Sequence, residues 1–353
     1  MHPLDIRGMV AWITPDQVDL LRAVSRAAQI PVLGVGTPDA GRASELGAAL
    51  NAESFDDLRA CLASASSTLV YLMAPAQFGA DPEGSEARVL ADARQRGVTV
   101  ATTEPMPASV LQTLAPSAVL SPAAVADPAA AWARTVPLAR HTRPVREAME
   151  ALTAFGEVRA VSVSCLCGPA EGSLGARLFD ALDLVLTLMG DAALIDAAYV
   201  ARDAAKGLHA LPGDSLRGLN GEISANLRFA DGRAACTLAS DQAGRWECVL
   251  TAIGPAGRMR IYNDGFEWIS PKGDKLDEAR HRRPRRGPAM DPETPLSALI
   301  IAEQLARLLD GTVPPESSST HARTLATAEA ALLSARTGES ESPGTILKMA
   351  GTS

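Results

Sequence analysis

Two carboxylates lie three residues apart in a stretch that is otherwise strongly apolar. Asp180 and Asp183 are less than one helical turn apart, so a helix places both on one face, with Arg177 and Thr187 on the same stripe. Carboxylates on a mostly buried helix must be paired, hydrated or placed at a cleft. The pair predicts either a general base or metal-binding site, or a polar seam that holds Arg177 or another cation across the interface between two domains. The sequence places no histidine nearby to complete a metal set.

A second polar group follows the first apolar run of the chain. Thr14, Pro15 and Asp16 come after the apolar residues 9–13 and before a segment with apolar residues at helical spacing. Threonine is a good N-cap and proline is favoured at the first helical position, so the group predicts the start of a helix. The alternative is an anion site that uses the remaining backbone N–H groups of that helix end.

Three weaker candidates remain along the chain. Asp39 follows an apolar run at 32–35 and can cap the next helix. His141 is either a surface histidine or a contact for an anionic ligand, and the basic run 280–286 is either a solvated loop or a contact for an acidic partner. The sequence contains no P-loop, no G-x-S-x-G elbow and no zinc-ligand spacing.

Short apolar runs alternate with amphipathic segments over the first third of the chain. We expect strands at 9–13, 32–35, 69–73 and 98–102, and helices at 16–28, 41–50, 56–63 and 82–96. This order predicts a parallel sheet with helices on both faces. The Ala- and Pro-rich residues 105–135 predict a connector with short helices, so we place one α/β domain at 1–135 and a second domain at 136–353. The last helices of the second domain could pack back on the first.

The later chain alternates apolar and polar residues. We expect strands at 158–165, 223–229, 234–239, 246–253, 259–262 and 266–269, and helices at 143–155, 296–309 and 321–336. Asp231-Gly232 and Asn263-Asp264-Gly265 are typical hairpin turns. The strands from 223 to 269 predict an antiparallel meander in an α+β domain with an open, mostly antiparallel sheet. A long charged surface loop is expected at 271–295.

Composition narrows the class of protein. The 353 residues are 47% hydrophobic and carry a net charge of −8, which disfavours a nucleic-acid partner. Five cysteines, an odd number without C-x-x-C spacing, are typical of free thiols in a reducing compartment. We expect no secretory signal and no apolar run of the roughly 18 residues needed to span a bilayer. The sequence therefore predicts a cytoplasmic protein that does not bind a membrane.

Several segments carry a family resemblance through their order and spacing. They are an apolar run ending in an acidic residue at 32–39, a run ending in Ala-Pro at 69–75, Thr-Glu-Pro at the end of 97–105, Gly-Glu-Val within 155–161, a long apolar helix at 179–190, and the closing helices at 301–338. Together they resemble the glucose–fructose oxidoreductase / inositol dehydrogenase / MocA (Gfo/Idh/MocA) family over nearly the whole chain. The resemblance implies a Rossmann domain, NAD or NADP as cofactor, a sugar-like ligand, and pairing of identical copies through the C-terminal sheet.

The resemblance assigns three residues to the cofactor side. Asp39 corresponds to the acidic residue for the adenosine ribose, and Pro75 ends the strand segment that closes with a Thr-Pro or similar pair. Thr14 lies in the stretch 12–17, where the family has G-x-G-x-x-G and its glycines let the pyrophosphate approach the backbone. No glycine stands in that stretch here, so the sequence predicts a degenerate dinucleotide site.

The catalytic side of the resemblance rests on three further positions. Glu104 stands where the family has lysine, Asp180 where it has histidine, and Asp183 where it has aspartate. A glutamate cannot supply the fixed positive charge of that lysine, although it can act as a base if its pKa suits the task. We therefore expect a non-catalytic or strongly divergent member of this family. The alternative is an active NAD(P)-dependent dehydrogenase of a sugar, polyol or related hydroxyl compound.

Overall fold

The computed structural model describes residues 8–64, 67–78, 85–114, 133–202, 211–281, 294–313 and 318–351. The chain divides into two compact units, and each is described by itself below. The first unit comprises residues 1–137, 170–172 and 287–321, and the second comprises residues 138–169, 173–286 and 322–353.

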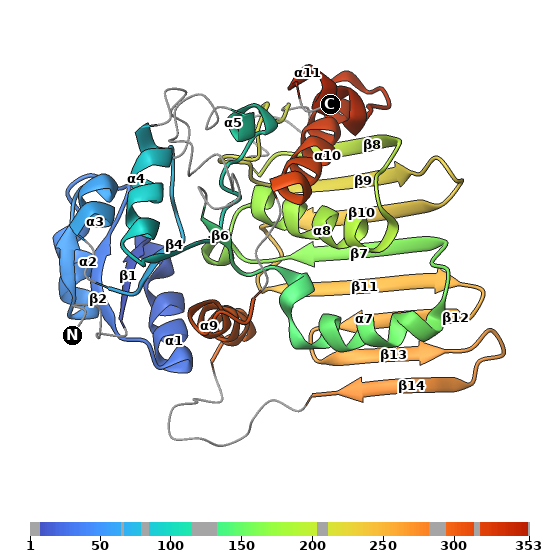
Figure 1. Cartoon of the computed structure of the whole chain (residues 1–353), viewed down its shortest axis with the longest axis horizontal. Coiled ribbons are helices and arrows are strands. Elements are labelled where there is room, and N and C mark those ends of the chain that lie inside the picture. Colours follow the sequence, from blue (N-terminus) through green and yellow to red (C-terminus); the bar gives the residue numbers. More distant parts are fainter. Residues whose placement is uncertain are drawn as a thin grey trace. The chain divides into compact units, whose positions relative to one another are not determined.

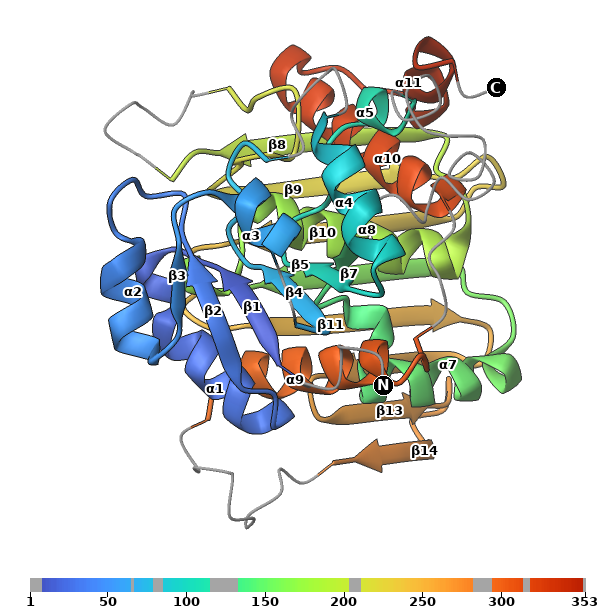
Figure 2. The same cartoon turned by 60° about the vertical axis from the view of Figure 1, so that its left-hand side comes forward.

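A six-stranded parallel sheet forms the centre of the first unit. Its strands are β1 (Met9–Trp12), β2 (Val32–Gly36), β3 (Glu53–Phe55), β4 (Leu69–Leu72), β5 (Thr99–Thr102) and β6 (Arg134–Thr135). They lie in the order β3-β2-β1-β4-β5-β6, and Figure 2 shows β3, β2, β1 and β4 side by side. The predicted parallel sheet is confirmed, with the short strands β3 and β6 added at its edges. Strand order reverses between β1 and β4, the point where open α/β sheets bind ligands beyond their carboxyl ends.

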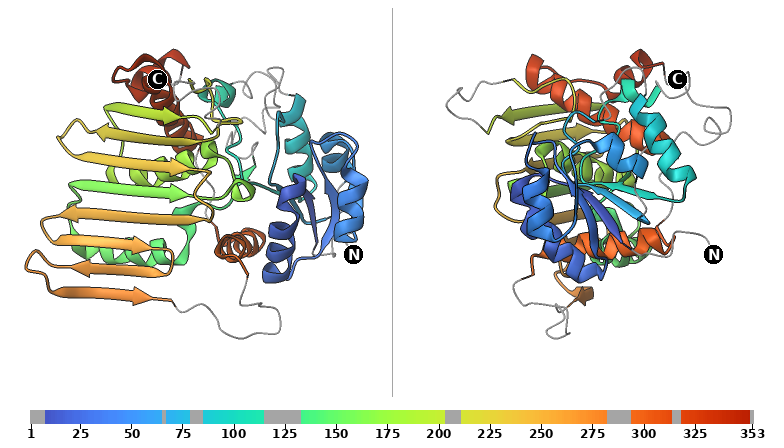
Figure 3. Two further views of the ribbon diagram at one scale, coloured as in Figure 1. Left: turned by 180° about the vertical axis from the view of Figure 1, so that it is seen from behind. Right: turned by 90° about the vertical axis from the view of Figure 1, so that its left-hand side faces the viewer.

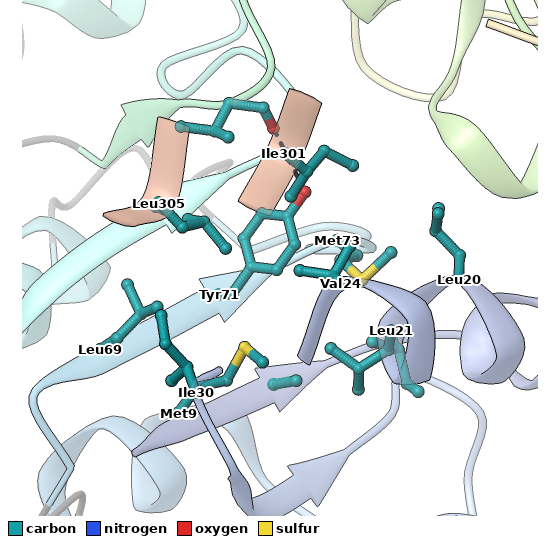
Figure 4. Packing of buried hydrophobic residues seen from close by; sticks show 14 of the residues in the cluster. Met9, Leu20, Leu21, Val24, Ile30, Leu69, Tyr71, Met73, Ile301 and Leu305 are labelled. Atoms are coloured by element: carbon teal, nitrogen blue, oxygen red, sulfur yellow. Dashed lines mark hydrogen bonds between the residues drawn. The ribbon is translucent and has the colours of Figure 1, made fainter. Parts of the chain in front are cut away.

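Helices cover both faces of this sheet because its side chains alternate. They are η1 (Pro15–Gln17), α1 (Val18–Ala28), α2 (Ala43–Leu50), α3 (Leu58–Ser64), α4 (Ser85–Gln95), α5 (Val110–Leu114) and α9 (Leu296–Leu309). Met9 and Ala11 face a core shared with α1 and α9, whereas Val10 and Trp12 face a core shared with α3 and α4. Figure 4 shows the first core, where Tyr71 of β4 lies near Ile301 of α9.

Helix α1 shows how the sequence fixes the start of this unit. Leu20, Leu21 and Val24 are buried at helical spacing, which gives the helix one apolar face. The helix ends at Gln29, whose backbone is left-handed (φ 57°) and whose N–H caps the last turn. The helix begins at the turn after β1 that the sequence analysis identified.

An eight-stranded sheet forms the centre of the second unit. Its strands are β7 (Ala160–Leu166), β8 (Leu194–Val200), β9 (Glu222–Arg228), β10 (Ala234–Ser240), β11 (Glu247–Gly254), β12 (Gly257–Tyr262), β13 (Gly265–Ile269) and β14 (Lys275–Arg280). They lie in the order β14-β13-β12-β11-β7-β10-β9-β8. All neighbours are antiparallel except β7 and β10, so the predicted mostly antiparallel sheet is confirmed.

One face of the eight-stranded sheet carries helices. The helical segments of this unit are η4 (Ala139–His141), α7 (Arg143–Phe155), α8 (Leu174–Met189), most of α10 (Ser318–Thr337), and α11 (Pro343–Met349). The short helix η5 (Pro169–Glu171) lies mostly in the first unit. Figure 1 shows α7 and α8 in front of the sheet, and Figure 3 shows the opposite face, which no helix of the described residues covers. The edge strand β8 is protected at its rim, because Ala197 N–H donates to Ser334 Oγ at 3.0 Å and Ile195 bridges Glu341.

The structure corrects two features of the sequence analysis. The expected surface loop at 271–295 contains strand β14, whose charged sequence suits an exposed sheet edge. The expected continuous meander is interrupted, because β7 lies between β10 and β11. Residues 115–132 of the predicted connector and 282–286 of the basic run lie outside the described residues.

Among the described residues, no helix is both long and apolar enough to cross a membrane.

Candidate functional site

The turn between β1 and α1 is closed by its own residues. Thr14 N–H donates to Gln17 Oε1 at 3.0 Å, and Gln17 N–H donates to the Thr14 carbonyl at 3.0 Å. Pro15 has no N–H, and Val18 N–H donates to the Pro15 carbonyl. Among residues 14–18, only the N–H of Asp16 is not used in these hydrogen bonds. The Asp16 carboxylate accepts from Thr14 Oγ1. The predicted helix start is confirmed, with Thr14 as N-cap and Pro15 in the first turn.

The side chain of Gln17 fixes this turn to its surroundings in the first unit. It is only 4% exposed. Its Nε2 donates to the carbonyl of Met73, beyond the end of β4, at 3.5 Å and to the carbonyl of Ala170 at 3.4 Å. The carboxamide therefore connects three segments of the unit at the carboxyl end of β1.

The turn does not fit the diphosphate of a dinucleotide. Such a group needs several backbone N–H groups at the helix start and a backbone without side chains in its way. Here one N–H is absent at Pro15, and the N–H groups of Thr14 and Gln17 have partners within the turn. The carboxylate of Asp16 adds a negative charge where phosphates would need positive potential. Where a dinucleotide site normally has glycines, this turn has residues whose side chains and hydrogen bonds occupy the space and the N–H groups that a diphosphate would need.

Pro75 and Glu104 lie at the same edge of the sheet as Thr14. The Trp12 carbonyl accepts from the N–H groups of Met73 and Ala74, so the segment with Pro75 adjoins the end of β1. Glu104 follows the neighbouring strand β5 and is half-buried. Its carbonyl accepts from Thr102 Oγ1 at 2.9 Å. The parallel strands thus bring the predicted positions together at one edge, without a lysine among them.

Asp39 lies beyond the end of β2, also at this edge, and is exposed. Its N–H donates to Thr37 Oγ1 at 3.2 Å, and its carbonyl accepts from Arg42 N–H at 3.2 Å. Both contacts are made by the backbone and shape the turn that leads into α2. The residue is exposed, so its carboxylate is accessible to solvent.

The two carboxylates of α8 belong to the second unit and are buried. Asp180 is 0% exposed and Asp183 is 2% exposed. Asp180 Oδ1 accepts from Ala139 N–H at 2.6 Å, and its Oδ2 accepts from Arg177 at 3.3 Å. Asp183 Oδ1 accepts from Arg140 at 2.8 Å. The arrangement is a polar seam with Arg177 as one cation and Arg140 as the other, but these residues all belong to the second unit, so the seam does not cross a domain interface as expected.

Burial and charge act in opposite directions on Asp180. Loss of solvent raises the pKa of Asp180, while Arg177, the Ala139 N–H and Arg140 lower it, and the net direction is upward. Oδ1 binds Ala139 N–H in the segment before α7 and so holds that segment against α8, whereas Oδ2 binds Arg177 one turn away on α8 itself. Asp180 is fully buried, and each of its two carboxylate oxygens has a hydrogen-bond partner.

His141 lies beside this seam and is half-buried. Arg140 Nε donates to His141 Nε2 at 3.3 Å, so this ring nitrogen is an acceptor in this arrangement. No group of three or more His, Cys, Asp or Glu in the described part of the chain can hold a metal ion. The metal-binding alternative for Asp180 and Asp183 therefore has no further ligands in the described residues.

Sequence reasoning missed two residues that organise these regions. Gln17 is three residues after Thr14, the spacing of a capping box, and that spacing was available as a signal. Arg140 pairs with Asp183 across 43 residues of sequence, and no local pattern indicates such a contact.

Known proteins resemble this chain in structure but not detectably in sequence. No protein-family model matches the chain, and no curated protein matches it by sequence. By structure, it resembles a levoglucosan dehydrogenase in complex with NADH and levoglucosan, with a TM-score of 0.66 at 12% identity over 95% of this chain and 98% of that one. It also resembles a UDP-N-acetylglucosamine 3-dehydrogenase from Acidithiobacillus ferrooxidans, with a TM-score of 0.60 at 18% identity over 93% and 97% of the two chains.

A further neighbour is described as a putative myo-inositol dehydrogenase from Sinorhizobium meliloti, with a TM-score of 0.60 at 18% identity, covering 95% of this chain and 99% of that one. At such identities the likeness concerns the fold, from the six-stranded parallel sheet to the eight-stranded mostly antiparallel one. The chain therefore shares the two-sheet architecture of these three structures.

Proposed function

We propose that this chain keeps the architecture of a sugar or polyol oxidoreductase without carrying out hydride transfer. The observation that carries the proposal is the turn at residues 14–18. Its N–H groups are absent or bonded within the turn except at Asp16, which is itself negatively charged. A dinucleotide held elsewhere only by Asp39 would lack the contacts that normally bind its diphosphate.

The buried seam on α8 supports the same proposal. Asp180 stands where the resemblance implies histidine, and it binds Ala139 N–H and Arg177. A general base must reach the proton that it removes, within about 3 Å or through one water. Asp180 is 0% exposed and meets this requirement poorly. Glu104 in place of lysine removes the other expected proton donor.

Cofactor binding tests this proposal directly. The full chain is titrated with NAD⁺, NADH, NADP⁺ and NADPH at millimolar concentration, and the melting temperature and tryptophan fluorescence are followed. A ligand that binds the folded state stabilises it by RT ln(1 + [L]/Kd), so binding would raise the melting temperature. Because we propose that no dinucleotide binds, we expect no shift in melting temperature. A saturable shift that Asp39→Ala abolishes would overturn the proposal, because it would show a dinucleotide bound at the carboxyl edge of the sheet.

The second candidate function is an active NAD(P)-dependent dehydrogenase, and Asp39 is the observation in its favour. Its exposed side chain stands at the end of β2, the position that the resemblance gives to the ribose contact. Turnover of a panel of sugars and polyols, followed by nicotinamide absorbance, separates the two functions. Reduction of NAD⁺ or NADP⁺ that is lost in Glu104→Gln or Asp183→Asn would favour this second function.

We also propose that two copies pair through the uncovered face of the eight-stranded sheet. Leu238 and Ile253 on this face are 44% and 50% exposed, although both lie inside the sheet on β10 and β11. A second copy with the same face would cover both side chains. Light scattering after gel filtration should give a dimer that Leu238→Arg dissociates. The matched control Met349→Arg, at an exposed position on α11, should leave it intact. A wild-type monomer would refute the pairing.

We also propose that the chain binds a sugar-like ligand and is located in the cytoplasm. The first rests on neighbours such as the levoglucosan dehydrogenase, whose structure holds levoglucosan. The second rests on five cysteines that are all unpaired by disulfide bonds in the structure.

A further inference from the structure

Two cysteines face each other across neighbouring strands in the core of the second unit. Cys165 of β7 lies directly opposite Cys248 of the antiparallel strand β11. Their Sγ atoms are 3.5 Å apart. Cys165 is 0% exposed and Cys248 is 6% exposed. The remaining cysteines lack such a partner in register, which makes this pair distinct within the chain.

The backbone shows which kind of cross-strand position the pair occupies. Cys248 N–H donates to Asn263 Oδ1 at 2.8 Å, away from β7. On β7, Cys167 N–H donates to the Ser240 carbonyl on β10, and Cys165, two residues earlier, shares this direction. The two cysteines therefore form a non-hydrogen-bonded pair, for which Cα atoms lie about 4.5 Å apart. A disulfide accepts Cα separations of about 4.4–6.8 Å, so the strands need not move to form one.

The surroundings of Cys165 disfavour its thiolate form. The hydrogen bond to Cys248 and burial raise the pKa of the Cys165 thiol, with a further contribution from Asp180. Thiolates are the nucleophiles in thiol oxidation, so this environment slows it. Cys61 of the first unit is a natural comparison, because burial raises the pKa of its thiol to about 12 and it has no opposing cysteine.

We propose that Cys165 and Cys248 are a modification site, a dithiol that hydrogen peroxide converts to an intrachain disulfide between β7 and β11. Peroxide is small enough to reach a side chain that is 6% exposed, so Cys248 reacts first. The Cys248 thiol loses its proton, and the thiolate attacks one peroxide oxygen while the O–O bond breaks. The leaving hydroxide combines with the proton that Cys248 released, and water forms. The resulting sulfenic acid is attacked by Cys165, whose proton leaves with the sulfenic oxygen as a second water. Two thiols are oxidised and one peroxide is reduced to two waters.

The cross-link would join positions 165 and 248, which are far apart in sequence. A disulfide stabilises chiefly by restricting the unfolded chain, and more so for a long loop. It would form beneath α8, whose Asp180 and Arg177 act electrostatically on Cys165. Oxidation should therefore raise the melting temperature of the second unit, and reductant should reverse the change.

Peptide mass spectrometry on the full chain tests the site. The native protein is treated with hydrogen peroxide, quenched in acid, alkylated after denaturation and digested. We expect a linked pair of peptides containing Cys165 and Cys248, and a rise in melting temperature that dithiothreitol removes. Both results should persist in Cys236→Ser, which removes the exposed thiol, and in Cys167→Ser, which removes the buried neighbour on the same segment.

Two variants and two outcomes decide the proposal. Cys165→Ala and Cys248→Ala should each lose the oxidant-dependent rise in melting temperature while remaining folded in reductant. If Cys248→Ala fails to fold, the cross-link in wild-type protein still decides the matter. Complete alkylation of Cys165 and Cys248 after peroxide treatment would overturn the proposal, as would a cross-link that joins either cysteine to Cys167 or Cys236.

Discussion

The turn after β1 and the seam on α8 both depart from the family pattern, but they are built differently. In the turn, Thr14 and Gln17 satisfy each other three residues apart, beside the exposed Asp16. On α8, Asp180 and Asp183 bind groups 41 and 43 residues away and are almost fully buried. The first departure is local and changes a loop. The second is part of the fold of its unit, so the chain cannot lose it without losing stability.

Asp180→Ala should have the largest effect on stability. The change removes the counter-charge of the buried Arg177 and the acceptor of the Ala139 N–H. Breaking one side of a buried charge pair typically costs about 3–5 kcal/mol. Urea unfolding measures the loss, with Asp39→Ala as the control, since an exposed carboxylate should change the free energy of unfolding by less than about 0.5 kcal/mol. If Asp180→Ala lowered the free energy of unfolding no more than Asp39→Ala does, the seam on α8 would not be a stabilising part of its unit.

Asp183→Asn should have a smaller effect, because the substitution preserves the shape of the side chain. The amide oxygen of Asn can still accept from Arg140, but it carries no negative charge, so the ion pair with the guanidinium is lost. Hydrogen bonds to charged groups contribute about 1.5–3 kcal/mol, so we expect a loss of about 2 kcal/mol. Thermal unfolding together with ligand titration checks it. Unchanged stability combined with lost ligand binding would instead make Asp183 part of a working site.

The sequence predicted the elements of both regions but only part of their contacts. The strand at 9–13 and the helix after Thr14 follow from hydrophobic spacing and capping residues, which act over a few positions. The polar seam followed from the rule that buried carboxylates need partners, which pointed to Arg177, three residues from Asp180. Arg140 escaped because its partner is distant in sequence and reaches it only through the fold.

The two sheets show the same limit. Local alternation predicted β9, β10 and β11, yet it could not show that β7 lies between β10 and β11, because strand order depends on long-range pairing. Strand β14 was interpreted as a loop since Lys275–Arg280 is mostly charged. Its place at the sheet edge makes those charges acceptable, and the sequence alone did not show that place.

Gln17→Ala tests the turn after β1 and should cost about 1 kcal/mol. The substitution leaves the Thr14 N–H without its acceptor at a helix start, and loss of capping contacts costs about 0.5–2 kcal/mol. Urea unfolding gives the value. Thr153→Ala on α7, whose hydroxyl only bonds back to the Glu150 carbonyl on an exposed surface, is a suitable control. Tight dinucleotide binding by Gln17→Ala would show that this one side chain blocks the site, and that a single substitution is enough to restore binding at the turn.

The pH dependence of Asp180 should give the smallest effect and the sharpest contrast between the two regions. Burial raises the pKa of Asp180 against the opposing action of Arg177, the Ala139 N–H and Arg140. A carboxyl that binds its proton more tightly in the folded state contributes stability below its unfolded pKa of 3.8, and this contribution is lost as pH rises through the folded pKa. Asp180→Asn cannot titrate, so the stability of wild type relative to this variant should fall as pH rises from about 4 towards neutrality. Unfolding free energies of both proteins over that range measure the difference. A wild type that gains on the variant with rising pH would show that Arg177 outweighs burial, and that the seam is a stabilising ion pair instead of a cost that the fold carries.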